Sequence, residues 1–280
     1  MTGSLEYEFI PRLSVPDFEE YFREERELSE KVRASRRSIV DIPYGKTERS
    51  RLDLFPGTSK KLPTLVFVHG GYWRSRHKDD FSFIANAVDQ AQAGVMVIGY
   101  DLCPIFTVQQ IVEQIQKAIL WISKNADDYG CRGDKLVLCG HSAGAHLLAA
   151  QLTTRRLSRK FSRELISSMV LISGIYRLDP VLQISVNNDV RLTSSEAKEL
   201  SPMQYPLDPL IPLDIVVGSA ETQGWQSQSS DFFAVVQQQS PLSTFHCRPG
   251  LNHFSIMREL AAPDRYIARI LQARLAEANR

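Results

Sequence analysis

Short apolar runs alternate with longer stretches of helical spacing through most of this chain, and that alternation constrains the possible folds more than any other feature of the sequence. The short runs are rich in β-branched residues, as is typical of strands buried on both faces. They occupy residues 52–55, 64–68, 95–99, 135–139, 168–172, 213–217 and 243–246. The helical stretches occupy residues 108–122, a segment from about 143, 227–239 and 263–276. Strands that alternate with helices predict an α/β fold with a mainly parallel central sheet and helices on both faces.

The 280 residues contain no repeat, low-complexity tract or flexible linker, so we expect one domain over residues 1–280. Residues 1–40 are predicted to form a helical extension. Within it, residues 17–37 are dominated by Glu, Arg and Lys with aromatic residues at helical spacing, which predicts a mostly exposed helix with solvated charges. Residues 177–212 break the alternation with five prolines and are predicted to form a small irregular cap. The alternative is a surface excursion without a role.

Composition excludes several classes of function. The 33 basic and 32 acidic side chains nearly cancel, whereas a nucleic-acid-binding surface needs an excess of Lys and Arg. No run reaches about 18 apolar residues and the N-terminus lacks the pattern of a secretory signal, so we expect neither a membrane partner nor secretion. The four cysteines, Cys103, Cys131, Cys139 and Cys247, form no C-x-x-C pair and are predicted to be buried, reduced thiols. A reducing, cytoplasmic location is therefore expected.

The strongest functional motif is Gly-His-Ser-Ala-Gly at residues 140–144, a G-x-S-x-G that follows the strand 135–139 directly and opens the next helix. Small residues on both sides let the backbone turn sharply and lift the Ser142 hydroxyl above the sheet, at the N-terminus of the helix. This placement predicts Ser142 as a catalytic nucleophile. The alternative is a tight turn with a capping serine.

A second motif, His-Gly-Gly-Tyr-Trp at residues 69–73, follows the strand 64–68. Acyl transfer builds negative charge on the former carbonyl oxygen, and adjacent glycines let backbone N–H groups approach that oxygen closely. In lipases and esterases such a loop supplies half of the oxyanion hole, and the residue after the nucleophile supplies the other half. The amides of Gly70, Gly71 and Ala143 are therefore the candidates, against the alternative of a plain glycine turn.

Two neighbouring groups of residues admit a functional or a structural interpretation. Tyr72 and Trp73 follow the glycines, so they are candidate walls of an acyl or aromatic pocket, or simply core aromatics. A local basic cluster is more typical of a solvated helix end than of an anion site. It consists of Arg155, Arg156, Arg159, Lys160 and Arg163.

A serine hydroxyl needs a base to become a nucleophile, and the chain has six histidines. His253 lies in a Gly- and Pro-marked loop between the last strand and the last helix, from which its ring could reach Ser142, and we predict it as the base. The other five lie in a charged loop, beside the elbow, in a strand or in the glycine loop, and fit less well. They are His77, His141, His146, His246 and His69. His141 and His146 are five positions apart, which matches no metal-binding helix pair, so no metal site is expected.

The base in turn needs an acid that fixes its tautomer and stabilises the imidazolium. In the chain order serine, acid, histidine, this acid should follow the strand 213–217. Glu221 is the one carboxylate in the loop 218–223, and we predict it as the acid. Asp214 within the strand and Asp231 on the following helix fit less well. The alternative is a solvated loop acid and an incomplete triad.

With these residues the chain resembles the α/β-hydrolases and, more closely, the kynurenine formamidases, also called arylformamidases. The resemblance runs from about Ile42 to the C-terminal helix. Besides the motif at 69–73, its most specific segments are Lys-Asp-Asp at 78–80, Gly-His-Ser-Ala-Gly-Ala-His at 140–146, Ser-Gly-Ile-Tyr at 173–176 and Asn-His-Phe at 252–254, with further similarity at 188–191 and 201–202. It implies an α/β-hydrolase fold. It also implies these site residues: Ser142 as nucleophile, Glu221 at the acid position, His253 as base, and Gly70, Gly71 and Ala143 near the oxyanion. The family usually has Asp where this chain has Glu221.

The resemblance implies hydrolysis of N-formyl-L-kynurenine to L-kynurenine and formate, a step of tryptophan catabolism, with no cofactor. The chemistry supports this independently, since an N-formyl aryl amide has an unhindered carbonyl and a nitrogen whose lone pair is shared with the ring. The nearest alternative is a carboxylesterase acting on short-chain aryl esters, and a more distant one is a non-catalytic, hydrolase-like binding protein. The expected partner is a small-molecule substrate. The sequence leaves the oligomeric state open, a homodimer being one option.

Overall fold

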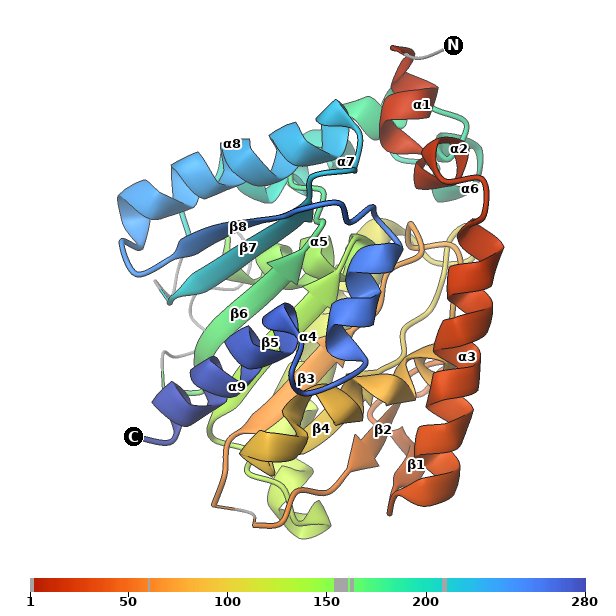
Figure 1. The fold of residues 1–280 in the computed structure, drawn as a ribbon. Helices are drawn as coiled ribbons and strands as arrows, with labels where there is room; N and C mark the ends of the chain where they lie inside the picture. The colour runs from red at the N-terminus through yellow and green to blue at the C-terminus, as the bar shows by residue number, and fades with distance from the viewer. Residues whose placement is uncertain (1–2, 60, 154–160, 162–163, 208–210) are drawn as a thin grey trace.

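The computed structural model describes residues 3–59, 61–153, 161, 164–207 and 211–280. Within these ranges its centre is an eight-stranded sheet in the order β1-β2-β4-β3-β5-β6-β7-β8 (Figure 1). The strands are β1 (Ile39–Pro43), β2 (Arg51–Phe55), β3 (Thr64–Val68), β4 (Gly94–Ile98), β5 (Leu136–His141), β6 (Ile166–Ile172), β7 (Leu213–Gly218) and β8 (Thr244–Arg248). The pairs β1–β2 and β2–β4 are antiparallel, and all other pairs are parallel. The predicted α/β class with a mainly parallel sheet is confirmed.

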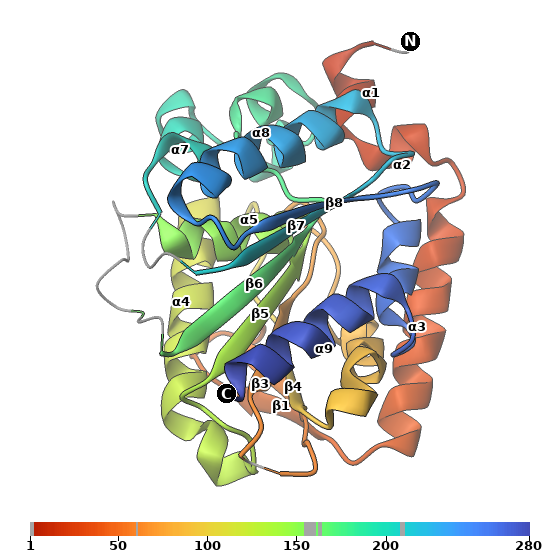
Figure 2. The same cartoon turned by 60° about the vertical axis from the view of Figure 1, so that its left-hand side comes forward.

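Two layers of helices cover the two faces of the sheet (Figure 1 and Figure 2). One layer contains α4 (Val108–Asn125), α5 (Ala143–Ala149) and α8 (Gln223–Gln239), and the other contains the 3₁₀-helix η1 (Lys78–Ala91) and α9 (Tyr266–Ala278), with α3 (Phe18–Ser35) packed against η1. Adjacent residues of β3 point into different layers, since Val66 packs in one hydrophobic cluster and Phe67 in the other. Both faces of β3, β4, β5, β6 and β7 are buried almost throughout, as their apolar composition predicted, whereas the edge strand β8 has no buried residue.

Two elements, β1 and η1, were not expected from the sequence. β1 lies at the edge of the sheet, and most of its residues are at least partly exposed, so it carries no continuous apolar run. η1 contains non-helical backbone at Phe81 and Val88, which interrupts the helical spacing of its apolar residues. Its start is nevertheless encoded locally, because His77 caps the helix with its side chain and the Asp80 side chain caps it in return.

Short helices lie mainly in the N-terminal segment and in residues 177–212. They are α1 (Leu5–Phe9), α2 (Pro11–Ser14), η4 (Asp179–Gln183), α6 (Asn187–Val190), α7 (Ser194–Glu199) and η5 (Pro202–Gln204), with η2 (Ala126–Tyr129), η3 (Ala150–Leu152) and η6 (Ser255–Leu260) elsewhere. Because α1 packs against both α8 and η4, these two segments, far apart in sequence, lie side by side (Figure 1). The predicted basic cluster from Arg155 to Arg163 lies outside the described residues. None of the helices in the described ranges has the length and apolar character to cross a bilayer.

The cysteines follow the prediction at three positions and depart from it at one. All four are free thiols, and Cys103, Cys131 and Cys139 are buried, but Cys247 is exposed. Cys247 lies on β8, the last strand of the sheet, which is only partly covered. The prediction of a buried thiol is therefore wrong there. Burial raises the pKa of the Cys103 and Cys131 thiols to about 11, so both stay protonated near neutral pH.

Candidate active site

Ser142 stands at a sharp turn between β5 and α5, and its backbone is strained. Its φ of 55° and ψ of −119° lie outside the regions that non-glycine residues favour. The amide of Ser142 donates to the carbonyl of Ile172 at 2.8 Å, which anchors the turn to β6. Gly144 follows in α5, where a Cβ would lie 2.1 Å from the carbonyl oxygen of Val68. Only glycine fits there, so the G-x-S-x-G spacing lets α5 pack directly against β3.

The structure brings the side chains of Ser142, His253 and Glu221 into one hydrogen-bonded series. His253 Nε2 lies 3.0 Å from Ser142 Oγ, and His253 Nδ1 lies 2.7 Å from Glu221 Oε2. The other carboxylate oxygen of Glu221 accepts hydrogen bonds from Ser173 Oγ at 2.6 Å and from the Gly218 amide at 2.8 Å. When Nδ1–H donates to the carboxylate, Nε2 is left as an acceptor that faces the serine hydroxyl.

The two acids that fitted less well are engaged elsewhere. Asp214 accepts hydrogen bonds from His246 and from Arg274, away from His253. Burial raises the pKa of Asp214, but these two hydrogen bonds outweigh burial and hold the pKa below its usual range. Asp231 faces Arg177 at 3.8 Å. In the described ranges, no group of three His, Cys, Asp or Glu side chains is placed to hold a metal ion.

The glycine loop lies against the serine. A Cβ on Gly70 would be 3.0 Å from Ser142 Cβ, and a Cβ on Gly71 would be 2.2 Å from the Ser75 carbonyl oxygen. Gly71 also has a φ of +118°, so both conformation and space require glycine at this position. Within the described part of the chain, neither the Gly71 amide nor the Ala143 amide donates a hydrogen bond. Gly71 lines the pocket above the serine, whereas Ala143 is buried at the start of α5.

Two buried histidines hold the backbone around the serine. His69 Nδ1 donates to the Gly70 carbonyl at 2.7 Å, and its ring is stacked between two aromatic rings. His141 Nε2 donates to the carbonyl of His253 at 3.0 Å. Burial lowers the pKa of His69 to about 3 and that of His141 well below its usual range. Both rings are thus neutral near pH 7 and serve to position backbone.

The two aromatic residues after the glycines have different surroundings. Tyr72 lines the pocket above the serine, and its hydroxyl donates to the Phe9 carbonyl at 2.5 Å. Trp73 is fully buried, and its Nε1–H donates to His146 Nδ1 at 3.2 Å. Of the two interpretations of Trp73, a pocket wall or a core aromatic, the structure matches the core aromatic. A buried indole N–H needs an acceptor, and His146 on α5 supplies it in the core.

A pocket opens over Ser142 and His253, and the N-terminal helices form much of its wall. Its empty space is ≈ 610 Å³ when the open mouth is included. The N-terminal segment contributes Ile10, Pro11, Arg12, Phe22 and Glu25. Of the described residues in 177–212, Val186 lines the pocket. The cover therefore comes mainly from α2 and α3, with the predicted cap beside them (Figure 1).

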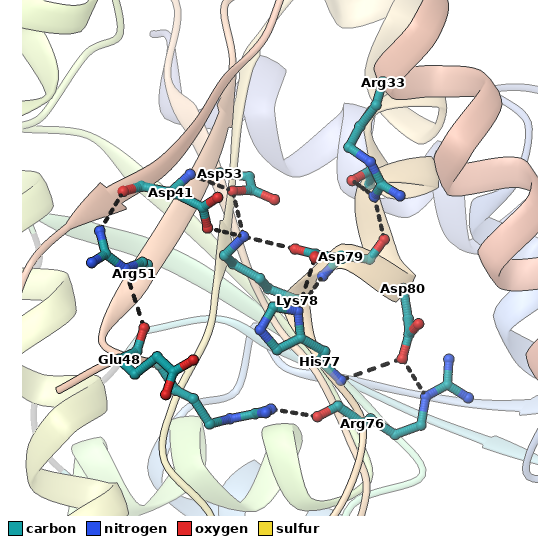
Figure 3. A network of polar contacts seen from close by, with 12 residues as sticks. Arg33, Asp41, Glu48, Arg51, Asp53, Arg76, His77, Lys78, Asp79 and Asp80 are labelled. Carbon is teal, nitrogen blue, oxygen red and sulfur yellow. Dashed lines mark hydrogen bonds and ion pairs between the residues drawn. The ribbon is translucent and has the colours of Figure 1, made fainter.

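One charge of α3 is not solvated. Glu25 is buried, and its Oε2 accepts a hydrogen bond from Arg76 Nη2 at 2.6 Å. Arg76 Nε also pairs with Asp80 at 3.0 Å (Figure 3), and the guanidinium carbon lies 3.8 Å from the ring centroid of Phe22. The prediction of solvated charges is therefore wrong for Glu25. The helical spacing of the sequence predicts which face of α3 packs inward, but it does not predict which cation pairs with Glu25.

The segment after the glycine loop is fixed by a buried lysine (Figure 3). Lys78 is 2% exposed, and its Nζ lies 2.8 Å from Asp41, 2.7 Å from Asp53 and 2.7 Å from Asp79. Burial alone would lower the pKa of Lys78, but the three carboxylates outweigh burial and raise it. These pairs join β1 and β2 to the start of η1, so the chain is held firmly where it leaves the glycine loop.

We expect the Glu25→Gln variant to lose less stability than the native protein when the pH rises from about 5 to about 8. Burial raises the pKa of Glu25 to about 7, although Arg76 opposes the shift. The unfolded chain has an ordinary pKa of about 4.3, so between these values the native state binds a proton that the unfolded state has lost. The free energy of unfolding therefore falls as the pH rises, by on the order of 3 kcal/mol across this window.

Urea unfolding of both proteins at the two pH values measures this difference. The buried neutral histidines contribute in the opposite direction, but they are common to both proteins and cancel in the comparison. Glu24→Gln is the matched control, because Glu24 is the neighbour of Glu25 on α3 and its side chain is 43% exposed. Parallel pH profiles for native protein and Glu25→Gln would contradict the raised pKa.

Comparisons with known proteins extend over most of the chain. A family model, BD-FAE, matches residues 52–170. The kynurenine formamidase of Salmo salar is 30% identical over 256 residues, which cover 88% of this chain and 85% of that protein. The kynurenine formamidase of Danio rerio is 28% identical over 250 residues, which cover 87% and 84%. A solved structure from Silicibacter sp. TM1040 has a TM-score of 0.85 at 24% identity and covers 96% of this chain and 98% of that chain.

Proposed function

This chain belongs to the kynurenine formamidase family of α/β-hydrolases, and we propose that it hydrolyses N-formyl-L-kynurenine to L-kynurenine and formate. The chain is thus an arylformamidase, a hydrolase of a linear amide bond. The observation that carries the proposal is the hydrogen-bonded series of Ser142, His253 and Glu221 at the base of a pocket, in a chain that matches the formamidases over most of its length.

In the first step, Ser142 Oγ attacks the formyl carbon while His253 Nε2 takes the hydroxyl proton. Glu221 accepts from Nδ1–H and stabilises the imidazolium that forms. The negative charge that develops on the formyl oxygen is met by the amides of Gly71 and Ala143, with Gly70 beside them. Losing one such donor typically costs about 3 kcal/mol of barrier, so the geometry of the glycine loop matters as much as the hydroxyl.

In the second step, the C–N bond breaks and His253 gives its proton to the departing aryl amine, so that L-kynurenine leaves and Ser142 carries a formyl ester. Water then attacks the ester carbon while His253 takes a proton from it. That proton passes to Ser142 Oγ as formic acid leaves, and formic acid then releases the second proton of the water to solvent and becomes formate. The protons moved to and from Ser142 and the aryl amine pass through the same ring nitrogen, and all of these groups belong to the chain, the substrate or water.

Purified protein is expected to hydrolyse N-formyl-L-kynurenine with a kcat/KM about 100-fold or more above its kcat/KM for phenyl acetate. The absorbance of released kynurenine and of released phenol measures the two rates. An aryl ester is the fair competitor, because the same nucleophile and base cleave esters, and a carboxylesterase is the alternative function. A preference for phenyl acetate would favour that alternative over the formamidase.

The same proposal extends to the setting of the enzyme. A reducing, cytoplasmic compartment is supported by four free thiols. A small-molecule partner, rather than nucleic acid, is supported by the formal charge of +1 and by the pocket that opens over Ser142 and His253. One domain over residues 1–280 is supported by the packing of α1 and α3 onto the body of the molecule.

A further inference from the structure

The pocket has a charged end that the proposed chemistry does not use. Arg12, Glu25, Arg74 and Arg76 all line it. Hydrolysis of an aryl formamide calls for none of these side chains, because the reacting atoms are served by the serine, the histidine and the backbone amides. Charged groups in an otherwise apolar pocket fix the orientation of a ligand and select its polar end. Their presence therefore points to a charged group on the substrate, remote from the bond that breaks.

Glu25 supplies a buried carboxyl group from α3, and burial raises its pKa to about 7, so it carries its negative charge above that pH. It is 7% exposed, and its Oε2 accepts a hydrogen bond from Arg76 Nη2 at 2.6 Å. A buried carboxylate is costly unless it is paired and hydrogen-bonded. A cationic group that enters the pocket beside it would add a second partner, so this wall favours an ammonium group.

The side chain of Arg76 is 7% exposed, and one of its nitrogen atoms has no acceptor within the described part of the chain. Its Nε and Nη2 pair with Asp80 and Glu25, whereas its buried Nη1 has no hydrogen-bond partner among the described residues. The guanidinium carbon lies over the rings of Phe22 and Phe81, 3.8 Å and 4.9 Å from their centroids, which holds the side chain in place. A buried donor without an acceptor is unfavourable, and a ligand oxygen would satisfy it.

Arg12 is an exposed cation at the rim of the pocket. Its guanidinium lies over the rings of Phe18 and Phe22, 4.9 Å and 5.6 Å from their centroids, and no carboxylate of the described ranges lies within ion-pair distance of it. Burial and the charges of Arg74 and Arg76 lower the pKa of Arg12. Arg74 pairs with Asp189 and Arg76 pairs with Glu25 and Asp80, so Arg12 is the cation of this group that has no ion-pair partner in the described ranges and can take an anionic ligand.

We propose that this end of the pocket binds the α-amino acid group of the substrate, with its carboxylate at Arg12 and the free Nη1 of Arg76 and its ammonium at Glu25. The Phe22 ring contacts both guanidinium groups, so the two cations and Glu25 face one region of the pocket. The inference rests on the proposed function, because N-formyl-L-kynurenine carries its formamide at one end and a zwitterionic amino acid at the other. The subsite would select aryl formamides that have this chain over those that lack it.

The test compares two substrates that differ only in the amino acid end, N-formyl-L-kynurenine and 2′-formamidoacetophenone. In Arg12→Gln and in Glu25→Gln, KM for formylkynurenine is expected to rise about 10- to 100-fold while kcat changes less than about two-fold, since the contact is equal in ground and transition states. Both parameters for the acetophenone analogue are expected to stay within about two-fold of the native values.

Arg23→Gln and Glu24→Gln are the matched controls. Both residues lie on α3 next to the proposed subsite, but Arg23 pairs with Glu27 on the surface and Glu24 pairs with Arg258. Neither lines the pocket, so both variants are expected to treat the two substrates as the native protein does. Because Arg12 is exposed, its variant tests the proposal even where Glu25→Gln disturbs folding.

Calorimetric binding of L-kynurenine and of 2′-aminoacetophenone separates the subsite from the proposed function, since it needs no turnover. The subsite predicts that the Kd of L-kynurenine rises in both variants while the Kd of 2′-aminoacetophenone does not. That result would support the subsite even if the native protein preferred phenyl acetate as a substrate and the proposed function were therefore wrong. Equal effects on both compounds, no effect on either, or no binding of L-kynurenine to the native protein would overturn the subsite.

Discussion

Replacing Ser142 with alanine is expected to lower kcat for N-formyl-L-kynurenine by about 10⁶-fold and to leave the fold intact. The variant removes the atom that attacks the formyl carbon, so His253 has no hydroxyl to deprotonate. Turnover then falls to what the oxyanion amides and the bound geometry supply to a water molecule, about 10³- to 10⁴-fold above the uncatalysed rate. The fold should persist because alanine keeps the Cβ of Ser142 and its strained φ of 55°.

Stopped and continuous assays of kynurenine release measure kcat, and the Tm from thermal unfolding shows whether the variant is folded. Ser168→Ala is the matched control, since Ser168 on β6 is also buried and its hydroxyl has no hydrogen-bond partner in the described ranges. It should keep native turnover. Turnover of Ser142→Ala within about ten-fold of the native rate would rule out a serine nucleophile.

The parts of this site that could be predicted from the sequence are those that depend on a strand and the loop that follows it. Ser142 follows β5, Gly70 follows β3, Glu221 follows β7 and His253 follows β8. In a parallel sheet all of these loops emerge at the same edge, so recognising the strands also places the loops near one another. β3, β5 and β7 were recognisable because they are buried on both faces and mostly apolar, whereas β8 is a partly exposed edge strand.

The parts that could not be predicted depend on tertiary contacts between segments that are far apart in the sequence. Glu25 and Arg76 are 51 residues apart, and nothing local in either segment marks the other as its partner. The sequence left open whether Trp73 forms a pocket wall or part of the core, and its indole N–H donates to His146 in the core. Likewise, the aromatic and charged spacing of α3 predicted a helix over the body without showing that Phe22 and Glu25 would line the pocket.

Replacing Glu221 with glutamine is expected to lower kcat by about 10⁴-fold with little change in KM, although the side chain keeps its size. The reason lies in the two fixed donors on its other oxygen. Ser173 Oγ and the Gly218 amide both donate to Oε1, so a glutamine would place its carbonyl oxygen there and turn its NH₂ group toward His253.

That NH₂ group is a donor, and it requires the lone pair of His253 Nδ1 as its acceptor. The ring proton must then sit on Nε2, which lies 3.0 Å from Ser142 Oγ. In this tautomer His253 presents an N–H to the serine and cannot take its proton, so the base is lost although every distance is preserved. The ¹⁵N chemical shifts of His253 should show the proton on Nδ1 in the native protein and on Nε2 in the variant.

The Glu221→Asp variant separates the contribution of the negative charge from that of the side-chain length. Aspartate keeps the negative charge but is one methylene shorter, so it cannot hold all three contacts made by Glu221 without a shift of the loop 218–223. Its kcat should lie between that of the native protein and that of Glu221→Gln, and the His253 ring proton should remain on Nδ1. If Glu221→Gln kept a rate within about ten-fold of native, or if the tautomer did not change, Glu221 would be only a structural acid and the base would be oriented by another group.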